Sequence, residues 1–171
     1  MTTFELSLIS TGGTIEKTYE TQSGTLSNAV SVLDHMLAQV RIPDLRIERV
    51  HLMNKDSLDM TGADHDLIAA TAYEHALSAD GVVVVHGTDR LAVSGEATNA
   101  LGTPGGPIVF TGAMRPYELR DTDALQNLIE ALLAVRLIDP GVYVAMHNRV
   151  LRFPGVIKDL EAGTFVGGLS G

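Results

Sequence analysis

The sequence contains no cysteine and no tryptophan among its 171 residues. Without cysteine the chain can form neither a disulfide framework nor a thiolate zinc site, and nothing in it favours an oxidising compartment. Its first residues also lack the basic and apolar pattern of a secretory signal, so we expect a cytoplasmic protein. No apolar run approaches the length of a membrane span.

Basic residues are also scarce. Lysine and arginine total 12 against 21 aspartates and glutamates, which gives a formal net charge of −9. This charge repels the phosphates of nucleic acids and the anionic surface of membranes, so we expect neither as a partner. The length and the 45% share of hydrophobic residues suit one compact domain over residues 1–171.

Short apolar segments alternate with longer segments of helical period, which is typical of an α/β fold built from βαβ units. Strands are predicted at residues 4–10, 46–52, 81–86, 107–111 and 141–146, and helices at residues 31–40, 62–79, 95–101 and 124–138. The four successive valines at positions 82–85 indicate a central strand covered on both faces. We therefore expect a mostly parallel open sheet with helices on both faces, of the flavodoxin or Rossmann type.

Local signals mark two of these helices and the end of the chain. Thr61 and Asp64 form a capping box that predicts the start of the second helix. In the fourth helix an apolar stripe predicts a face buried in the core. The stripe comprises Leu125, Leu128, Ile129, Leu132, Leu133 and Val135. The tail at residues 163–171 is rich in glycine and serine and is expected to be irregular.

Polar residues follow the predicted strands at the point where each strand ends. Ligands of open parallel sheets bind beyond the carboxyl ends of the strands, so these positions form the candidate site. The stretches are Thr11-Gly12-Gly13-Thr14, Lys55-Asp56-Ser57, Gly87-Thr88-Asp89 and Thr111-Gly112. They would bring hydroxyls, carboxylates and glycines to one edge of the sheet.

Thr14 is a candidate nucleophile with an open alternative. Paired glycines allow positive φ and close backbone approach, so amide groups could line a pocket beside its hydroxyl, but the same residues could equally form a tight turn. A threonine nucleophile needs a base. Asp89 is one candidate, although it could also cap a helix or form a turn. Lys158 is the other, although a lone lysine is most often a surface residue.

Other ligand classes lack their signatures. The sequence has neither a G-x-G-x-x-G dinucleotide fingerprint nor a G-x-x-x-x-G-K-[ST] phosphate loop. Its histidines show no metal-binding spacing, so we expect no metal and no cofactor. His86, which ends the valine strand, is predicted to be a packed and hydrogen-bonded residue that braces the Gly87 turn.

The same motifs, in the same order, resemble those of the bacterial asparaginase and glutaminase family. Thr11-Gly12-Gly13-Thr14-Ile15 and His86-Gly87-Thr88-Asp89 look like its two signatures. Lys55-Asp56-Ser57-Leu58-Asp59-Met60 resembles its loop for the substrate carboxylate, and Thr111-Gly112-Ala113-Met114-Arg115-Pro116 resembles a further structural motif. Leu58 and Arg90 depart from the residues that are usual at those positions.

The resemblance implies a role for each matching residue. Thr14 is the implied nucleophile, with Tyr19 beside it in a lid over residues 15–26. Thr88, Asp89 and Lys158 are implied to form a second hydroxyl cluster. Ser57 would hold the α-carboxylate of an amino-acid substrate, and Asp89 its α-ammonium group. The implied substrate-binding residues are Gly13, Asp56, Ser57, Thr88, Asp89 and Ala113.

The implied activity is hydrolysis of the side-chain amide of L-asparagine to L-aspartate and ammonia through a threonyl ester. L-Glutamine differs by one methylene, which only the depth of the pocket distinguishes. The chain is similar to short-chain L-asparaginases, which lack the usual smaller second domain, and a homodimer or homotetramer is expected. The alternatives are an amino-acid-binding or regulatory module without turnover, and the amidase subunit of a glutamyl-tRNA amidotransferase.

Overall fold

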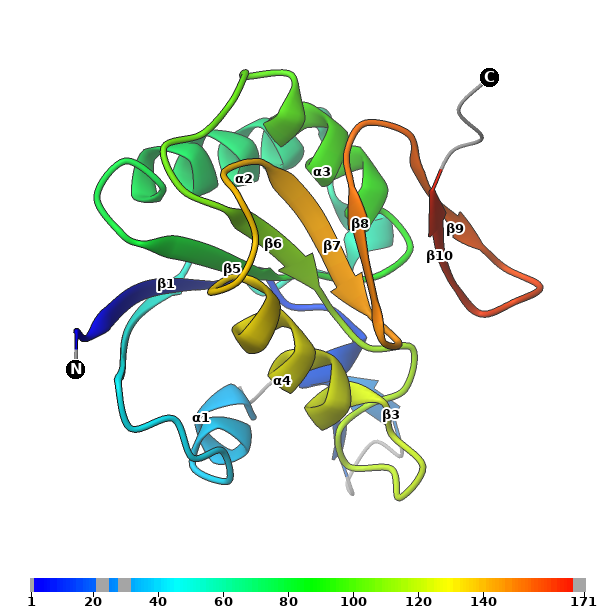
Figure 1. Cartoon of the computed structure of the whole chain (residues 1–171). Coiled ribbons are helices and arrows are strands. Elements are labelled where there is room, and N and C mark those ends of the chain that lie inside the picture. The colour runs from blue at the N-terminus through cyan, green and yellow to red at the C-terminus, as the bar shows by residue number, and fades with distance from the viewer. Residues whose placement is uncertain (1, 21–24, 28–31, 168–171) are drawn as a thin grey trace.

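The computed structural model describes residues 2–20, 25–27 and 32–167. Its centre is a six-stranded sheet in the order β4-β1-β5-β6-β7-β8 (Figure 1). The strands are Phe4–Ser10 (β1), Leu45–His51 (β4), Gly81–Val85 (β5), Ile108–Thr111 (β6), Val142–Met146 (β7) and Arg149–Arg152 (β8). Neighbours from β4 to β7 are parallel, and β8 is antiparallel to β7. The predicted mostly parallel sheet is confirmed, with each predicted strand boundary within one residue.

The order of the parallel strands locates the ligand-binding edge. Numbered by their succession in the main sheet, β4, β1, β5, β6 and β7 follow the flavodoxin-like order 2-1-3-4-5. In such a sheet the connections leave in opposite directions on either side of the first strand. This creates a crevice beyond the carboxyl ends of β1 and β5.

Among the described residues, four helices cover the sheet in two layers: Leu33–Leu37 (α1), Gly62–His75 (α2), Leu91–Asn99 (α3) and Ala124–Ala134 (α4). Figure 1 shows α2 and α3 on one face and α1 and α4 on the other. Successive side chains of β1 point to opposite faces, so Leu8 packs in the core on the α4 side and Ile9 in the core on the α2 side. Within the described ranges, no helix is long and apolar enough to cross a membrane.

The starts of α2 and α4 are as predicted, but the other helix bounds differ. Thr61 Oγ1 accepts a hydrogen bond from Asp64 N at 3.3 Å, and Asp64 Oδ2 accepts one from Thr61 N at 2.8 Å, which confirms the capping box. Helix α3 begins at Leu91, so the start predicted at residue 95 was wrong. Gly95 lies inside this helix, and a glycine is needed there because a Cβ would lie 2.1 Å from Cζ of Phe153.

Helices α1, α2 and α4 end earlier than predicted, because the residues that follow them form single turns rather than α-helix. Residue 31, where the first helix was predicted to start, lies outside the described residues. The prediction that the whole apolar stripe of α4 is core was also wrong. Leu128 and Leu132 are buried, whereas Ile129 and Leu133 are 43% and 58% exposed. The exposed pair is spaced i and i+4 and shares the outer face of the helix, which the sheet does not cover.

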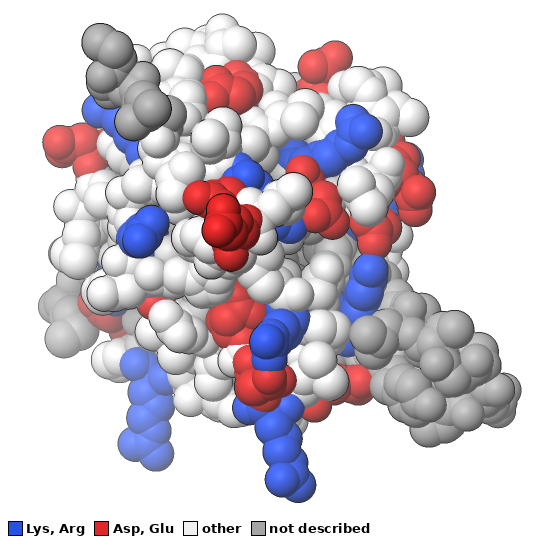
Figure 2. Space-filling view, turned by 90° about the vertical axis from the view of Figure 1, so that its right-hand side faces the viewer, with Lys and Arg blue, Asp and Glu red and all other residues white. Residues whose placement is uncertain are grey.

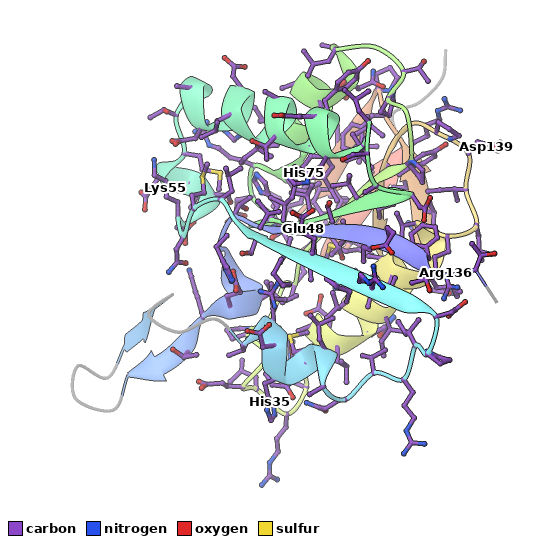
Figure 3. The ribbon with its side chains drawn as sticks, turned by 90° about the vertical axis from the view of Figure 1, so that its left-hand side faces the viewer. His35, Glu48, Lys55, His75, Arg136 and Asp139 are labelled. Carbon is purple, nitrogen blue, oxygen red and sulfur yellow. The ribbon has the colours of Figure 1, made fainter. Side chains whose placement is uncertain are left out.

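The edge strand β8 was not predicted, and neither were two hairpins outside the main sheet in the described part of the chain. Thr18–Glu20 (β2) pairs with Thr25–Ser27 (β3), and this hairpin projects from the body at the end of the sheet where Lys55 lies (Figure 3). Val156–Asp159 (β9) pairs with Thr164–Gly167 (β10) beyond β8. The prediction of an irregular tail was therefore wrong for residues 164–167, and residues 168–171 lie outside the described residues.

Candidate active site

The loops after β1, β4 and β5 are joined at the carboxyl end of the sheet. The backbone N–H and the hydroxyl of Thr11 both donate to the carbonyl of Val85, at 3.1 and 2.9 Å. The carbonyl of Thr11 accepts a hydrogen bond from Lys55 N at 3.0 Å. Because Thr11 directly precedes the paired glycines, these bonds fix the start of the Gly12-Gly13-Thr14 loop between the other two loops.

Glycines let these loops pack backbone against backbone. Gly13 has φ of +91°, and a Cβ there would lie 2.5 Å from Cα and N of Gly87. A Cβ on Gly87 would lie 2.7 Å from Cβ and Oγ of Ser57, and one on Gly112 would lie 2.3 Å from the carbonyl oxygen of His86. The Thr11-Gly12-Gly13-Thr14 stretch is therefore a tight corner packed against the backbone after β5, and this packing is compatible with either interpretation of the motif.

Thr88, Asp89 and Lys158 form a bonded cluster. Lys158, on β9, donates from Nζ to Thr88 Oγ1 at 2.9 Å and to Asp89 Oδ1 at 2.7 Å. Thr88 is buried, and the side chains of Lys158 and Asp89 are 17% and 41% exposed. Lys158 is thus not a solvated surface lysine, and Asp89 is not the cap of α3, whose N-cap is Arg90.

Thr14 begins a short 3-10 helix, η1 (Thr14–Glu16), and is half-buried. Thr14 follows Gly13 directly, and Thr88 follows Gly87 directly. Because the backbones of the two glycines are in contact, the two threonines start from adjacent points of the backbone. Tyr19 lies on β2, where its backbone pairs with Leu26. Residues 21–24 of the predicted lid lie outside the described residues.

Asp56 and Ser57 lie in the loop after β4. Ser57 is buried in the 3-10 helix η2 (Ser57–Asp59), and its Oγ accepts from Arg90 N at 3.3 Å. Both carboxylate oxygens of Asp56 are used within the protein: Oδ2 pairs with Lys17 Nζ at 2.7 Å, and Oδ1 accepts from Leu58 N at 3.0 Å. The Lys17 ammonium, and then the Leu58 amide, hold the pKa of Asp56 below its usual range. Asp56 therefore stabilises the loop and links it to η1.

The loop after β6 is held by α4. The side chain of Ala113 packs in the core on the α4 side, so only its backbone can face a ligand. Met114 and Arg115 donate their backbone N–H groups to Asp123 at 3.0 Å each, and Asn127 Nδ2 donates to the Gly112 carbonyl at 2.9 Å. Burial acts to raise the pKa of Asp123, but its hydrogen-bond donors together hold that pKa below its usual range.

His86 braces the Gly87 turn from inside the protein, as predicted. Its ring is fully buried, with Nδ1 2.7 Å from the Gly87 carbonyl and Nε2 2.8 Å from Ser94 Oγ. Burial lowers the pKa of His86 to about 4, so the ring is neutral at neutral pH. A carbonyl only accepts, so Nδ1 carries the proton and Nε2 accepts from Ser94. The Ser94 oxygen then accepts from Nδ1 of His65, 2.7 Å away.

Several supporting residues carry no signal in the sequence. No motif includes the supporting residues Lys17, Ser94, Asp123 and His147, each of which has a partner more than 20 residues away in the sequence. Across the residues the structure describes, no group of three or more histidines and carboxylates is placed to hold a metal ion.

Comparison with known proteins identifies the family. A family model described as "Asparaginase, N-terminal" matches residues 5–159. The chain belongs to the asparaginase family. An L-asparaginase of Thermococcus kodakarensis is 35% identical over 150 residues, which are 86% of this chain and 45% of that protein. A subunit of the glutamyl-tRNA(Gln) amidotransferase of Haloquadratum walsbyi is 37% identical over 147 residues, which are 83% of this chain and 33% of that protein.

A solved structure confirms the fold of the family. The thermostable L-asparaginase from Thermococcus kodakarensis matches with a TM-score of 0.84 and 31% identity, over 95% of this chain and 51% of that chain. The resemblance inferred from the motifs is therefore confirmed. This asparaginase-family chain spans from one third to about half the length of the relatives it matches.

Proposed function

We propose that this chain hydrolyses the side-chain amide of L-asparagine, with Thr14 as the nucleophile and residues 1–171 as an N-terminal-type catalytic domain. The bonded cluster of Thr88, Asp89 and Lys158 beside the Gly13–Gly87 contact carries this proposal. A module that only bound an amino acid would need groups for its carboxylate and ammonium, but no lysine held against a second hydroxyl. Membership of the asparaginase family supports an amidohydrolase.

Substrate binding uses the two ends of the amino acid. Ser57, at the start of η2, is the proposed partner of the α-carboxylate, together with the backbone of its loop. Asp89 is the proposed partner of the α-ammonium group: Oδ1 is bonded to Lys158, and a carboxylate has room for further donors. The backbones of Gly13 and Ala113 and the neighbouring Asp56 loop complete the pocket.

In the first step, Thr14 Oγ forms a bond to the amide carbon and its proton passes to a base, for which Asp89 and Lys158 are the candidates. Tyr19 is proposed to lie beside Thr14. The carbonyl oxygen becomes an oxyanion, held by backbone N–H groups near Thr14 and Thr88. The carbon–nitrogen bond then breaks, and the nitrogen takes up a proton and leaves as ammonia. Loss of one oxyanion donor typically costs about 2.7 to 4 kcal/mol in the barrier.

In the second step, water attacks the threonyl ester and releases aspartate and the Thr14 hydroxyl. Thr88 is the proposed contact for this water. Lys158 donates to Thr88 Oγ1, so the hydroxyl proton of Thr88 points away from the lysine and is available to another acceptor. The cluster thereby restricts the orientation of a buried hydroxyl.

Release of ammonia from L-asparagine tests the proposal. Thr14→Ala should reduce turnover to background while circular dichroism and the unfolding midpoint stay close to those of the wild type. Thr71→Ala is the matched control, because Thr71 bears an exposed hydroxyl that bonds only along α2, to the Leu67 carbonyl. Unchanged turnover in Thr14→Ala would exclude Thr14 as the nucleophile.

A second candidate is an amidase that draws ammonia from glutamine, which the identity to a glutamyl-tRNA(Gln) amidotransferase component favours. One methylene of substrate length is worth about 1 to 3 kcal/mol, or roughly 10- to 200-fold in kcat/KM. Measuring kcat/KM for both free amino acids separates the two candidates. A preference for glutamine of this size would favour the second.

We also infer that the chain forms a homodimer or homotetramer in the cytoplasm. Ile129 and Leu133 of α4 and Leu137 in the turn after it are 43%, 58% and 73% exposed, an apolar surface of the kind that subunits cover. The absence of cysteine supports the location. A monomer mass in light scattering would contradict the oligomer. Recovery in the membrane fraction would contradict the cytoplasmic location.

A further inference from the structure

The hairpin that carries Lys158 is not part of the main sheet. Strands β9 and β10 pair only with each other in the described sheets, and Figure 1 shows them beyond the edge strand β8. Val156 and Phe165 are buried and anchor the hairpin to the core on the α2 side. Apolar contact has no preferred direction, so the position of Lys158 depends on directional contacts as well. These include its own bonds to Thr88 and Asp89, and the bond from Gly155 N to Glu96 Oε1 at 2.6 Å.

Long-range charge attraction is a poor candidate for fixing that position. Figure 2 shows Lys and Arg interspersed with Asp and Glu over the face of the molecule that carries the hairpin. Interspersed surface charges largely cancel beyond roughly one Debye length, about 8 to 10 Å at physiological salt. A short, directional contact is needed instead.

Such a contact is present on β10. Thr164 Oγ1 lies 2.9 Å from Nδ1 of His147, in the turn between β7 and β8, and Nε2 of the same ring lies 2.7 Å from Asp123 Oδ2. Thr164 pairs with Asp159 in the hairpin, and the adjacent pair is Phe165 with Lys158. The three residues share the composition of a hydrolase triad, but Thr164 is buried within the hairpin, so its hydroxyl serves as a structural contact.

The chemistry of the three groups fixes the direction of these bonds. An ionised carboxylate only accepts, so His147 donates from Nε2–H to Asp123. In a neutral ring Nδ1 then accepts from the Thr164 hydroxyl, and in a charged ring it donates to the Thr164 oxygen. The contact therefore persists in both states of the ring. Asp123 is in turn fixed by the backbone N–H groups of Met114 and Arg115.

We propose that Asp123, His147 and Thr164 are positioning residues for Lys158, joining the loop after β6 to the hairpin so that the lysine meets Thr88. This inference rests on the proposed catalytic use of Lys158. A displacement of about 1 Å at a reacting group can cost up to about 100-fold in rate. Loss of the Thr164 hydroxyl should therefore lower kcat roughly tenfold, with a smaller change in KM because the Ser57 loop is untouched.

Two substitutions at one position test the proposal. Thr164→Val keeps the shape and removes the hydroxyl, whereas Thr164→Ser keeps the hydroxyl and removes a methyl group. We expect kcat per folded molecule to fall in the valine variant and to stay within about twofold of the wild type in the serine variant. If the contact only stabilised the fold, the valine variant would unfold more easily but keep its kcat, and that result would overturn the proposal.

Amide hydrogen exchange at residues 156–159 gives a readout that needs no turnover. We expect faster exchange in Thr164→Val than in the wild type, and recovery in Thr164→Ser. If the wild type releases no ammonia from any amide, the proposed function fails, and exchange alone tests whether the Thr164 hydroxyl positions the hairpin. Equal exchange in all three proteins would overturn that positioning role.

Discussion

Replacing His86 by asparagine should remove much of the loss of stability that this protein suffers in acid. His86 is fully buried as a neutral ring between the Gly87 carbonyl and Ser94. Burial, with a smaller contribution from His65 and against a hydrogen bond to Gly87, lowers the pKa of His86 from 6.5 to about 4. Asparagine keeps an N–H donor near the position of Nδ1 but does not titrate in this range.

The sign and the size follow from the two pKa values. Between pH 6.5 and about 4 the unfolded chain binds a proton at His86 that the folded chain does not bind. The contribution to stability is fully present above the unfolded pKa, and it is lost as the pH falls toward the folded pKa. Each pH unit in this window is worth about 1.4 kcal/mol, so from about pH 7 to about pH 4.5 the loss is about 2 to 3 kcal/mol.

Urea unfolding at about pH 7 and about pH 4.5 measures this loss. His35→Asn is the matched control, because His35 is an exposed histidine on α1 (Figure 3). The carboxylates contribute equally in all three proteins and cancel in the comparison. We expect the drop in unfolding free energy to be smaller by about 2 to 3 kcal/mol in His86→Asn and unchanged in His35→Asn. An identical drop in the wild type and His86→Asn would refute the neutral buried ring.

Three further substitutions probe the fold and the crevice. Thr61→Ala removes the cap of α2 and should lower the unfolding free energy by about 1 kcal/mol in urea titrations, with an unchanged midpoint as the contrary result. Gly95→Ala places a methyl group 2.1 Å from the buried Phe153 ring and should cost about 1 to 3 kcal/mol by calorimetry. Gly87→Ala places a methyl group 2.7 Å from Ser57, the proposed partner of the substrate carboxylate. KM for asparagine should therefore rise roughly tenfold or more, and an unaltered KM would contradict the assigned pocket.

The five parallel strands of the main sheet could be predicted because they carry local signals, whereas its edge strand β8 was not predicted. The valine run of β5 is buried at every position, and such a run indicates a central strand without any knowledge of its neighbours. The hairpins β2–β3 and β9–β10 could not be predicted in this way. Their strands have three or four residues each, which is too short for alternation of apolar and polar residues to be recognised.

Some residues of the candidate site could likewise be predicted from local signals, and others could not. Strand order brings the loops that carry Thr14, Ser57 and Thr88 to one edge, and this grouping follows from the parallel sheet alone. Lys158 could not be placed by that rule, because β9 lies outside the main sheet and contacts Asp89 across 69 residues of sequence. Only the family resemblance singled it out.

The dependence of Lys158 on β10 extends the candidate site past the residues that the family model matches. The family model ends at residue 159, directly after the lysine. Strand β9, however, has its pairing partner in Thr164–Gly167, and Phe165 of that strand is buried in the core. The hydroxyl that ties the hairpin to His147 also lies past the matched residues. Residues 164–167 therefore belong with the candidate site, because they pair with the strand that carries its lysine.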